Sequence, residues 1–130
     1  MIILDTHIWI WWVSEHPRRP QKYREYIQVH VNEGLGVSII SCWEVAKLVE
    51  YQRLSLALPI EEWLNNALVY PDIQLLDLTP RIIVESTKLP GSFHRDPADQ
   101  LIVATARVFK SPLVSLDIKI QDYLHVNTQP

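Results

Sequence analysis

Residues 93–106 read FHRDPADQLIVATA and place two aspartates, three positions apart, in front of an apolar run. Asp96 followed by Pro97 is typical of a helix start, because an aspartate side chain caps the first turn and proline suits the first helical position. The apolar residues behind them recur at helical spacing and predict a helix with one buried face. Asp99 then has two explanations: a favourable charge near the helix N-terminus, or a ligand for a metal ion.

Outward from this helix, short apolar strands alternate with helices. Strands are expected at residues 1–5, 35–40, 72–78 and 111–117, with an edge strand or a tail at 125–130. Helices are expected at residues 7–16, 20–33, 42–52, 59–70, 79–89, 96–110 and 118–124. This alternation predicts an α/β fold, a three-layer α/β/α sandwich around a central parallel sheet of four to five strands.

The composition is that of a globular protein, and residues 1–130 are expected to form one domain. Hydrophobic residues make up 48% of the chain and charged residues 21%, which excludes a disordered chain. The apolar runs fall short of the roughly 20 residues that a membrane span needs, and the start does not read as a signal peptide. One cysteine, Cys42, excludes an internal disulfide and a cysteine-based zinc site, so a cytoplasmic location is expected.

The charge balance restricts how this chain can bind nucleic acid. Fifteen acidic residues stand against twelve basic ones, for a net charge of -3, whereas nucleic-acid binders are usually basic. Either the protein does not bind nucleic acid, or its positive charge is local and a cation completes the site. The bases cluster at residues 17–24, PRRPQKYR, which is either a solvated helix start or a patch that faces phosphate.

Four carboxylates fall where strands are expected to end or helices to begin, namely those of Asp5, Glu44, Asp99 and Asp117. In open parallel sheets, ligands bind beyond the carboxyl ends of the strands. Each acid also has a local explanation as a cap or first-turn charge, and Glu44 fits a capping box with Ser41. Four carboxylates that can converge repel one another, so a fold that keeps them together favours a bound cation. Oxygen ligands suit Mg²⁺ or Mn²⁺.

The segments LDTHIWIWW, SIISCWEVAKL, HRDPADQLIVATA and LVSLD follow one another along the chain. In this order and spacing they resemble the PIN domain, and in particular the VapC-type toxin ribonucleases of prokaryotic toxin–antitoxin pairs. The resemblance covers nearly the whole chain, and its central segment is the most specific.

The resemblance also implies roles for individual residues. It makes the four acids the catalytic and metal-binding set: Asp5, Glu44, Asp99 and Asp117. It suggests Thr6 and Ser115 as polar supports beside them. Asp96 then becomes the cap and Asp99 the ligand, although Asp96 can also reach the metal through water.

The activity implied is that of a metal-dependent endoribonuclease, the toxin of a toxin–antitoxin pair, which hydrolyses phosphodiester bonds in structured RNA such as tRNA or rRNA. A divalent ion would lower the pKa of bound water and neutralise phosphate charge, and one or two ions fit equally well. The implied partners are an antitoxin and a second copy in a homodimer, with no membrane. The basic residues expected to contact RNA are Arg95, Lys47, Arg18 and Arg19.

Two alternatives remain open. A non-catalytic PIN-like scaffold that only binds a partner would be marked by a lost acid, yet all four acids are present. A phosphotransfer domain of the receiver type needs an acidic pair after the first strand, where ILDTH offers one acid, and His7 occupies the second position of an Asp-x-Asp phosphatase motif. Trp9 and Trp12 are expected in a core or an interface rather than as base-stacking platforms. The apolar first helix favours such an interface, and His7 and His94 are expected to be structural.

Overall fold

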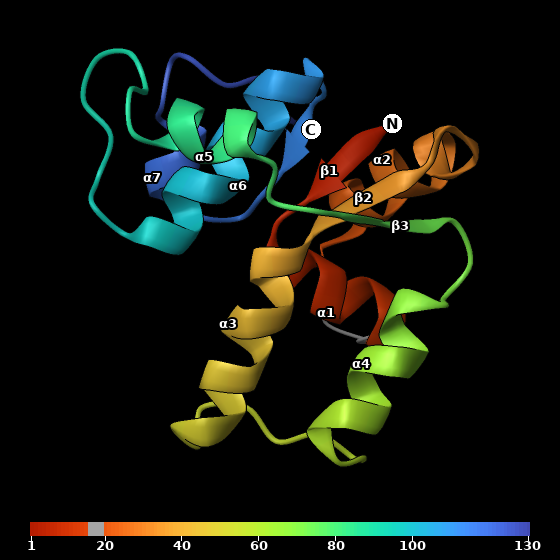
Figure 1. Cartoon of the computed structure of the whole chain (residues 1–130). Helices are drawn as coiled ribbons and strands as arrows, with labels where there is room; N and C mark the ends of the chain where they lie inside the picture. Colours follow the sequence, from red (N-terminus) through yellow and green to blue (C-terminus); the bar gives the residue numbers. More distant parts are fainter. Residues whose placement is uncertain (16–19) are drawn as a thin grey trace.

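Figure 1 shows the computed structural model, which describes residues 1–15 and 20–130. Its centre is a parallel sheet with the strand order β3-β2-β1-β4-β5. The strands are β1 (Ile2–Leu4), β2 (Leu35–Ser38), β3 (Ile73–Leu76), β4 (Leu113–Val114) and β5 (Thr128–Gln129). The predicted parallel sheet is therefore confirmed, and the segment that was expected as an edge strand or a tail is an edge strand.

Helices cover both faces of this sheet. They are α1 (Thr6–Ser14), α2 (Gln21–His30), α3 (Ile39–Glu50), α4 (Ile60–Leu68), α5 (Pro80–Ser86), α6 (Pro97–Phe109) and α7 (Ile118–Gln121), with a 3-10 turn η1 (Val31–Glu33) behind α2. Figure 1 places α1, α3 and α4 on one side of the sheet and α5, α6 and α7 on the other. None of the helices described here has the length and apolar composition that crossing a bilayer would require.

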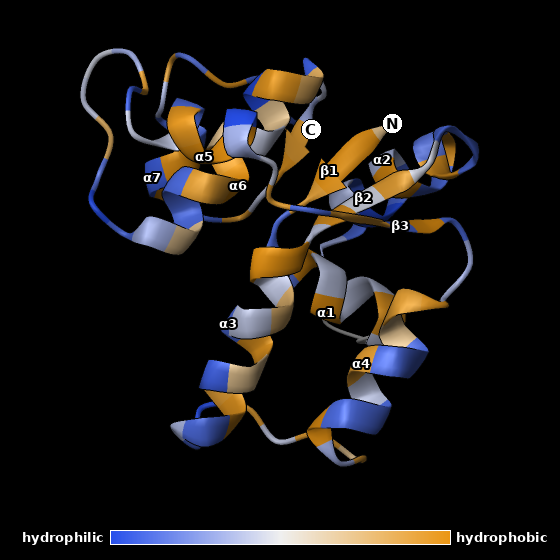
Figure 2. Ribbon diagram, viewed as in Figure 1, coloured by the Kyte–Doolittle hydropathy of each residue, from blue (hydrophilic) through white to orange (hydrophobic). Residues whose placement is uncertain are grey.

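Two hydrophobic clusters join these layers, and β1 contributes to both. Ile2 and Leu4 pack with α1, α2 and α3, whereas Ile3 packs with α6 and α7. Successive side chains of a strand point to opposite faces, so a continuous apolar run is what a strand buried on both sides requires. Figure 2 shows the same pattern as hydrophobic colour along β1 and β2 at the centre of the molecule.

The apolar residues of α1 belong to this core. Trp9 has an exposed fraction of 0%, and Ile8, Ile10 and Trp12 are also buried. The Trp9 ring contacts the Trp63 ring of α4 edge-on, with centroids 5.2 Å apart. The core therefore explains the apolar composition of α1, which had been taken to favour an interface.

The start of α3 differs from the prediction. The helix begins at Ile39, and the Ser38 hydroxyl caps it by accepting a hydrogen bond of 3.2 Å from the backbone N–H of Ile40. The predicted strand continued to residue 40 and the predicted cap was Ser41, which instead lies buried inside the first turn. A segment as short as VSII does not show whether its apolar residues follow the two-residue period of a strand or the 3.6-residue period of a helix. For this reason the boundary was misplaced.

The strand order explains where a site can form. The chain crosses from β1 to β2 on one side, and β4 pairs with β1 on the other. The helices that follow β1, β2 and β4 therefore begin at the same edge of the sheet. In open α/β sheets this reversal of strand order is where ligands bind.

The cap of α3 can be tested directly. We expect Ser38→Ala to lower the free energy of unfolding by about 1 kcal/mol, because one first-turn N–H loses its acceptor. Denaturant unfolding measures this, with Thr79→Ala at the cap of α5 as a matched comparison. If Thr79→Ala showed the cost and Ser38→Ala did not, the assignment of Ser38 as the cap would be wrong.

Candidate metal centre

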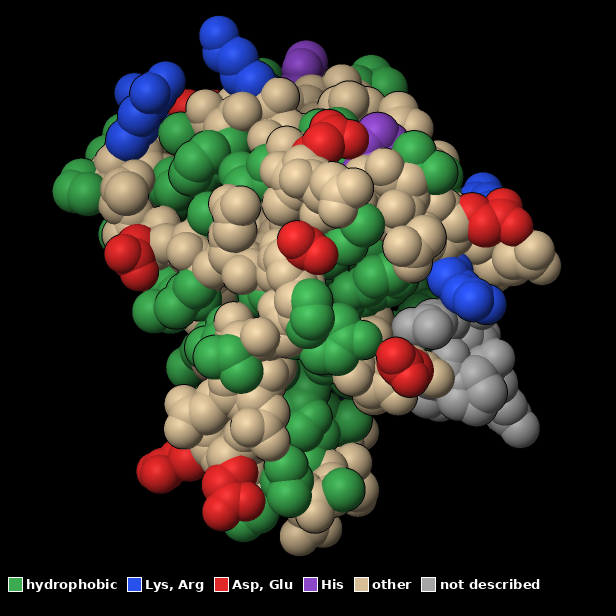
Figure 3. Space-filling model, turned by 90° about the vertical axis from the view of Figure 1, so that its right-hand side faces the viewer, with side chains coloured by type: hydrophobic (Ala, Val, Ile, Leu, Met, Phe, Trp, Pro, Cys, Tyr) green, Lys and Arg blue, Asp and Glu red, His purple; other side chains and the backbone are tan. Residues whose placement is uncertain are grey.

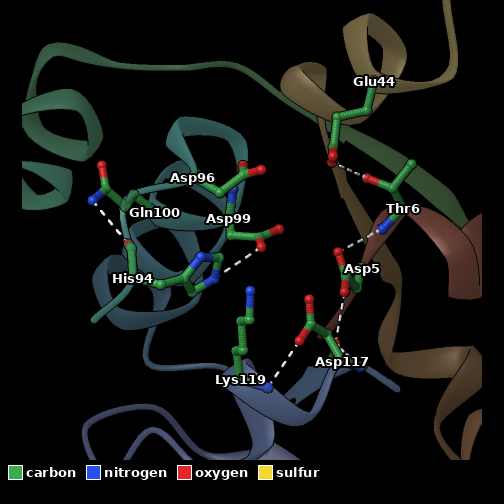
Figure 4. A network of polar contacts seen from close by, with 10 residues as sticks. Asp5, Thr6, Glu44, His94, Asp96, Asp99, Gln100, Asp117 and Lys119 are labelled. Carbon is green, nitrogen blue, oxygen red and sulfur yellow. Dashed lines mark hydrogen bonds and ion pairs between the residues drawn. The ribbon is translucent and has the colours of Figure 1, made fainter. Parts of the chain in front are cut away.

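A cavity of about 480 Å³ opens at this edge of the sheet. Acidic side chains dominate its lining, which consists of Asp5, Thr6, His7, Trp11, Glu44, Asp96, Asp99, Leu116 and Asp117. Figure 4 shows the carboxylates of Asp5, Glu44, Asp99 and Asp117 reaching toward a shared space from four separate segments. The four acids that the sequence singled out are thus brought to one cavity.

Asp5 is the most buried of these acids, with an exposed fraction of 6%. It follows β1, and its Oδ1 accepts a hydrogen bond of 2.8 Å from the backbone N–H of Thr6, which makes it the N-cap of α1. Its Oδ2 accepts a hydrogen bond of 2.6 Å from the Ser115 hydroxyl. Both carboxylate oxygens are therefore fixed in direction by groups on two neighbouring strand ends.

Glu44 lies one turn into α3 and is held by Thr6 rather than by its own helix. The Thr6 hydroxyl donates to Glu44 Oε1 at 2.5 Å, and a hydrogen bond of 2.8 Å joins the hydroxyls of Thr6 and Ser41. The predicted capping box between Ser41 and Glu44 is therefore wrong, since both side chains turn toward α1. The two residues are three apart and share one helix face, which lets a single threonine contact both.

Asp96 and Asp99 divide two tasks at the start of α6. Asp96 caps the helix by accepting a hydrogen bond of 3.1 Å from the backbone N–H of Asp99. The Asp99 side chain, 14% exposed, points into the cavity, and its Oδ2 lies 3.0 Å from Nε2 of His94. These two atoms do not meet the geometry of a hydrogen bond, so the two side chains are in contact without being hydrogen-bonded.

Asp117 follows β4 and caps α7, because its Oδ1 accepts a hydrogen bond of 2.8 Å from the backbone N–H of Lys119. The Ser115 hydroxyl, which donates to Asp5, also accepts a hydrogen bond of 3.0 Å from the backbone N–H of Asp117. One buried hydroxyl therefore ties the ends of β1 and β4 together beside the cavity.

Three of the four acids are close enough to share one ion. One carboxylate oxygen from each of Asp5, Glu44 and Asp99 lies within 4.8 Å of the other two. Asp117 lines the same cavity but lies outside this set of three. An all-oxygen set of carboxylates fits a hard divalent cation such as Mg²⁺ or Mn²⁺.

The electrostatics of the cavity also favour a cation. Burial raises the pKa of Asp5 above its usual range, against hydrogen bonds from Ser115 and Thr6 that lower it. Burial, with the charges of neighbouring acids, raises the pKa of Glu44 to about 7 and that of Asp99 to about 8. Carboxyl groups that hold their protons so strongly lie where negative charge is unfavourable without a counter-ion.

Of the basic residues expected to contact RNA, the two that the structure describes, Arg95 and Lys47, do not line this cavity. Arg95 is exposed beside the cap of α6. Lys47 forms an ion pair of 3.0 Å with Glu50 and lies 5.9 Å from the centre of the Trp43 ring. Arg18 and Arg19 lie outside the described residues.

Three other residues beside the site were not predicted as part of it. Ser41 had been assigned as a cap, and His94 as a structural loop residue, yet they contact Thr6 and Asp99. Lys119 had no assigned role, although Figure 4 shows its side chain extending between His94 and Asp117. The spacing of Ser41 and Glu44 on one helix face was a usable signal, whereas the position of Lys119 depends on the path of the chain after β4.

Comparisons with known proteins agree with this geometry. Residues 2–124 match the sequence model of the PIN domain. The chain is 35% identical over 124 residues to a protein of Mycobacterium tuberculosis named Ribonuclease VapC22. The aligned residues make up 95% of this chain and 92% of that protein.

Solved structures share the fold. VapBC2 from Rickettsia felis, bound to a DNA fragment from its promoter, has a TM-score of 0.69 at 18% identity, over 99% of this chain and 98% of the other. A toxin-antitoxin complex from Klebsiella pneumoniae has a TM-score of 0.65 at 18% identity, over 95% and 92% of the two chains.

The raised pKa values predict how metal-free stability depends on pH. Between about pH 4 and 8 the folded chain keeps protons on Glu44 and Asp99 that the unfolded chain releases. The free energy of unfolding therefore falls as the pH rises through this range. We expect the melting temperature in chelator to drop from pH 5 to pH 8, and saturating Mn²⁺ to reverse the drop. Asp99→Asn should flatten the metal-free profile, and a metal-free melting temperature that rises over this range would contradict the assignment.

Ser115 provides a test of how the ligands are oriented. We expect Ser115→Ala to weaken Mn²⁺ binding roughly 10- to 100-fold, because Asp5 loses the hydroxyl that directs Oδ2. Isothermal titration calorimetry with Mn²⁺ measures this. Ser14→Ala is the matched control, since that exposed hydroxyl bonds only to the Trp11 carbonyl among its described contacts. Equal affinities for wild type and Ser115→Ala would contradict the role.

Proposed function

Because this chain belongs to the PIN domain family, we propose that it is a metal-dependent endoribonuclease and the toxin of a toxin–antitoxin pair. The observation that carries the proposal is the gathering of three carboxylates within 4.8 Å, from three separate segments, in one cavity. Its relative from Mycobacterium tuberculosis is named a ribonuclease. We take residues 1–130 as one domain that carries the whole activity.

The proposed cofactor is Mg²⁺ or Mn²⁺, held by Asp5, Glu44 and Asp99, with Asp117 completing the acidic set. When bound, such an ion supplies a nucleophile from water at neutral pH and neutralises charge on a phosphodiester. The choice of these two metals rests on the oxygen-only donors of the cavity.

The chain's own residues keep this centre ready for a substrate. Ser115 and Thr6 hold the carboxylates of Asp5 and Glu44 in fixed directions before RNA arrives. Trp11 and Leu116 add apolar wall to the cavity, which limits water around the charged groups. Without a cation, the acids would repel the phosphate backbone of RNA, so metal binding and substrate binding are coupled.

We propose structured RNA, such as tRNA or rRNA, as the substrate class. The net charge of -3 means that general electrostatic attraction contributes little, so RNA must be held by local contacts and by the cation. Arg95, which is exposed beside α6, stays a candidate for such a contact, as do Lys47, Arg18 and Arg19.

The proposed protein partner is an antitoxin. Apolar side chains are exposed on α3 and in the segments that flank α3 and α4, including Trp43 with an exposed fraction of 53% and Tyr51, Leu58 and Val69. Figure 3 shows apolar side chains gathered in the lower half of one face, among acidic ones. A second exposed set on β3, α5 and α6, Leu75, Ile83, Val84 and Phe109, supports a homodimer.

Cleavage of RNA tests the activity and the metal together. Partner-free protein is incubated with total cellular RNA in Mg²⁺ or Mn²⁺ and in chelator, and new RNA ends are mapped by sequencing. We expect discrete cuts that require metal and that fall to the level of the chelator control in Asp5→Asn, because the centre loses an anionic ligand.

Asp77→Asn is the matched control for this experiment, since Asp77 is exposed and is not among the residues that line the cavity. It should cleave like the wild type. If wild type and Asp5→Asn left RNA equally intact in both metals while both were folded, the nuclease proposal would fail and a partner-binding scaffold would replace it.

A further inference from the structure

A second cavity of about 430 Å³ lies beside the metal centre. We propose that it binds a nucleobase of the RNA substrate, from a nucleotide next to the phosphate that is cleaved. The proposal rests on the proposed nuclease function and names the part of the molecule that would select the cut site. Its volume is within the usual range of small-ligand pockets.

Two residues connect this cavity to the acidic one. His94 lines the second cavity, while its Nε2 lies 3.0 Å from Asp99 Oδ2. Lys119 also lines it, while its backbone N–H donates to Asp117. Figure 4 shows the His94 ring beside Asp99 and the Lys119 side chain extending between His94 and Asp117. A nucleotide in the second cavity would therefore be next to residues that contact the acidic set.

Aromatic rings form a row along the wall of this cavity. The centroids of His94 and Phe93 are 4.5 Å apart, those of Phe93 and Tyr123 are 4.8 Å apart, and those of Tyr123 and His125 are 5.4 Å apart. The Tyr123 hydroxyl donates to the Pro90 carbonyl, which fixes this ring. Rigid aromatic and histidine rings are surfaces on which unpaired bases stack.

The charges around the cavity favour a base inside it and a phosphate at its edge. Lys119 is exposed and forms no ion pair with any described residue, so its ammonium group is available to a phosphate oxygen. Asp122 also lines the cavity, and its carboxylate disfavours a second anion there but accepts hydrogen bonds from base N–H groups. A bare phosphate site would not place a carboxylate in its lining.

Gly91 lines the cavity with a φ of +65°, a backbone conformation that favours glycine. A Cβ at its position would make ordinary van der Waals contact, 3.4 Å, with Nε2 of His125. The backbone of this residue therefore lies directly beside the outer ring of the aromatic row.

Binding of small probes tests the cavity independently of cleavage. The chain of residues 1–130 in Mg²⁺ buffer is titrated with adenosine monophosphate, uridine monophosphate and ribose 5-phosphate, and amide chemical shifts are followed by NMR. We expect the two nucleotides to shift amides at residues 91–94 and 119–125, and ribose 5-phosphate to bind there at least about fivefold more weakly. Equal binding of all three, or shifts confined to the acidic cavity, would overturn the proposal.

Variants separate stacking from charge. His125→Ala should weaken nucleotide binding at least about fivefold and leave ribose 5-phosphate unchanged, whereas His30→Ala, at another histidine on α2, should change neither. Lys119→Ala should weaken binding of all three probes, and Lys119→Arg should restore it, because a positive charge at that position is what the phosphate needs. If His125→Ala and His30→Ala behaved alike, no base would be stacking on this wall.

Cleavage then links the cavity to selection of the cut site. On RNA that wild type cuts, His125→Ala should raise KM and relax the preference for the base next to the cut, with a smaller effect on kcat. Unchanged KM and unchanged cut sites would overturn the role in selection. Loss of all RNA cleavage by the wild type would instead count against the nuclease function, while the probe titrations would still report on the cavity.

Discussion

The hydrogen bond from Ser115 to Asp5 joins the ends of β1 and β4, and the rest of the site depends on it. Asp5 is almost fully buried, and burial of a carboxylate is unfavourable unless hydrogen bonds or opposite charges accompany it. The Ser115 hydroxyl and the Thr6 backbone provide two hydrogen bonds, which offset part of that cost. The remainder makes a bound cation favourable. The fold thus buries a carboxylate where its negative charge is unfavourable without a cation and where it can act as a ligand.

Capping a helix and lining the acidic cavity are not alternatives in this protein. Asp5 and Asp117 each cap a helix through one carboxylate oxygen while they line the acidic cavity. Capping fixes the side chain relative to the backbone, so the carboxylate is positioned before a cation binds. At α6 the two tasks are separated, because Asp96 caps and leaves Asp99 to point into the cavity. The requirement for an ordered helix start therefore also orders the site.

The sequence predicted the parts of this structure that depend on local pattern. Asp96 followed by Pro97, and the strand exits at Asp5 and Asp117, were readable because caps and buried strands have characteristic residues at fixed offsets. The start of α3 was misplaced because Ile39 and Ile40 suit a strand as well as a helix. The contacts of Thr6 with Ser41 and Glu44 join segments 35 and 38 residues apart, and no local pattern encodes them. The second cavity was not predicted, since its wall forms only when residues 91–94 meet residues 119–125 in space.

The distance along the chain between Asp5 and Ser115, 110 residues, has a consequence for the order of events during protein synthesis. Asp5 is synthesised before the strand that carries Ser115, which follows 110 residues later. The carboxylates can be gathered only after β4 has paired with β1, and contacts of such long range form late. A chain that ends before β4 therefore lacks the assembled centre. For a proposed nuclease made in the midst of cellular RNA, the topology itself would delay activity until β4 has been synthesised and has paired with β1.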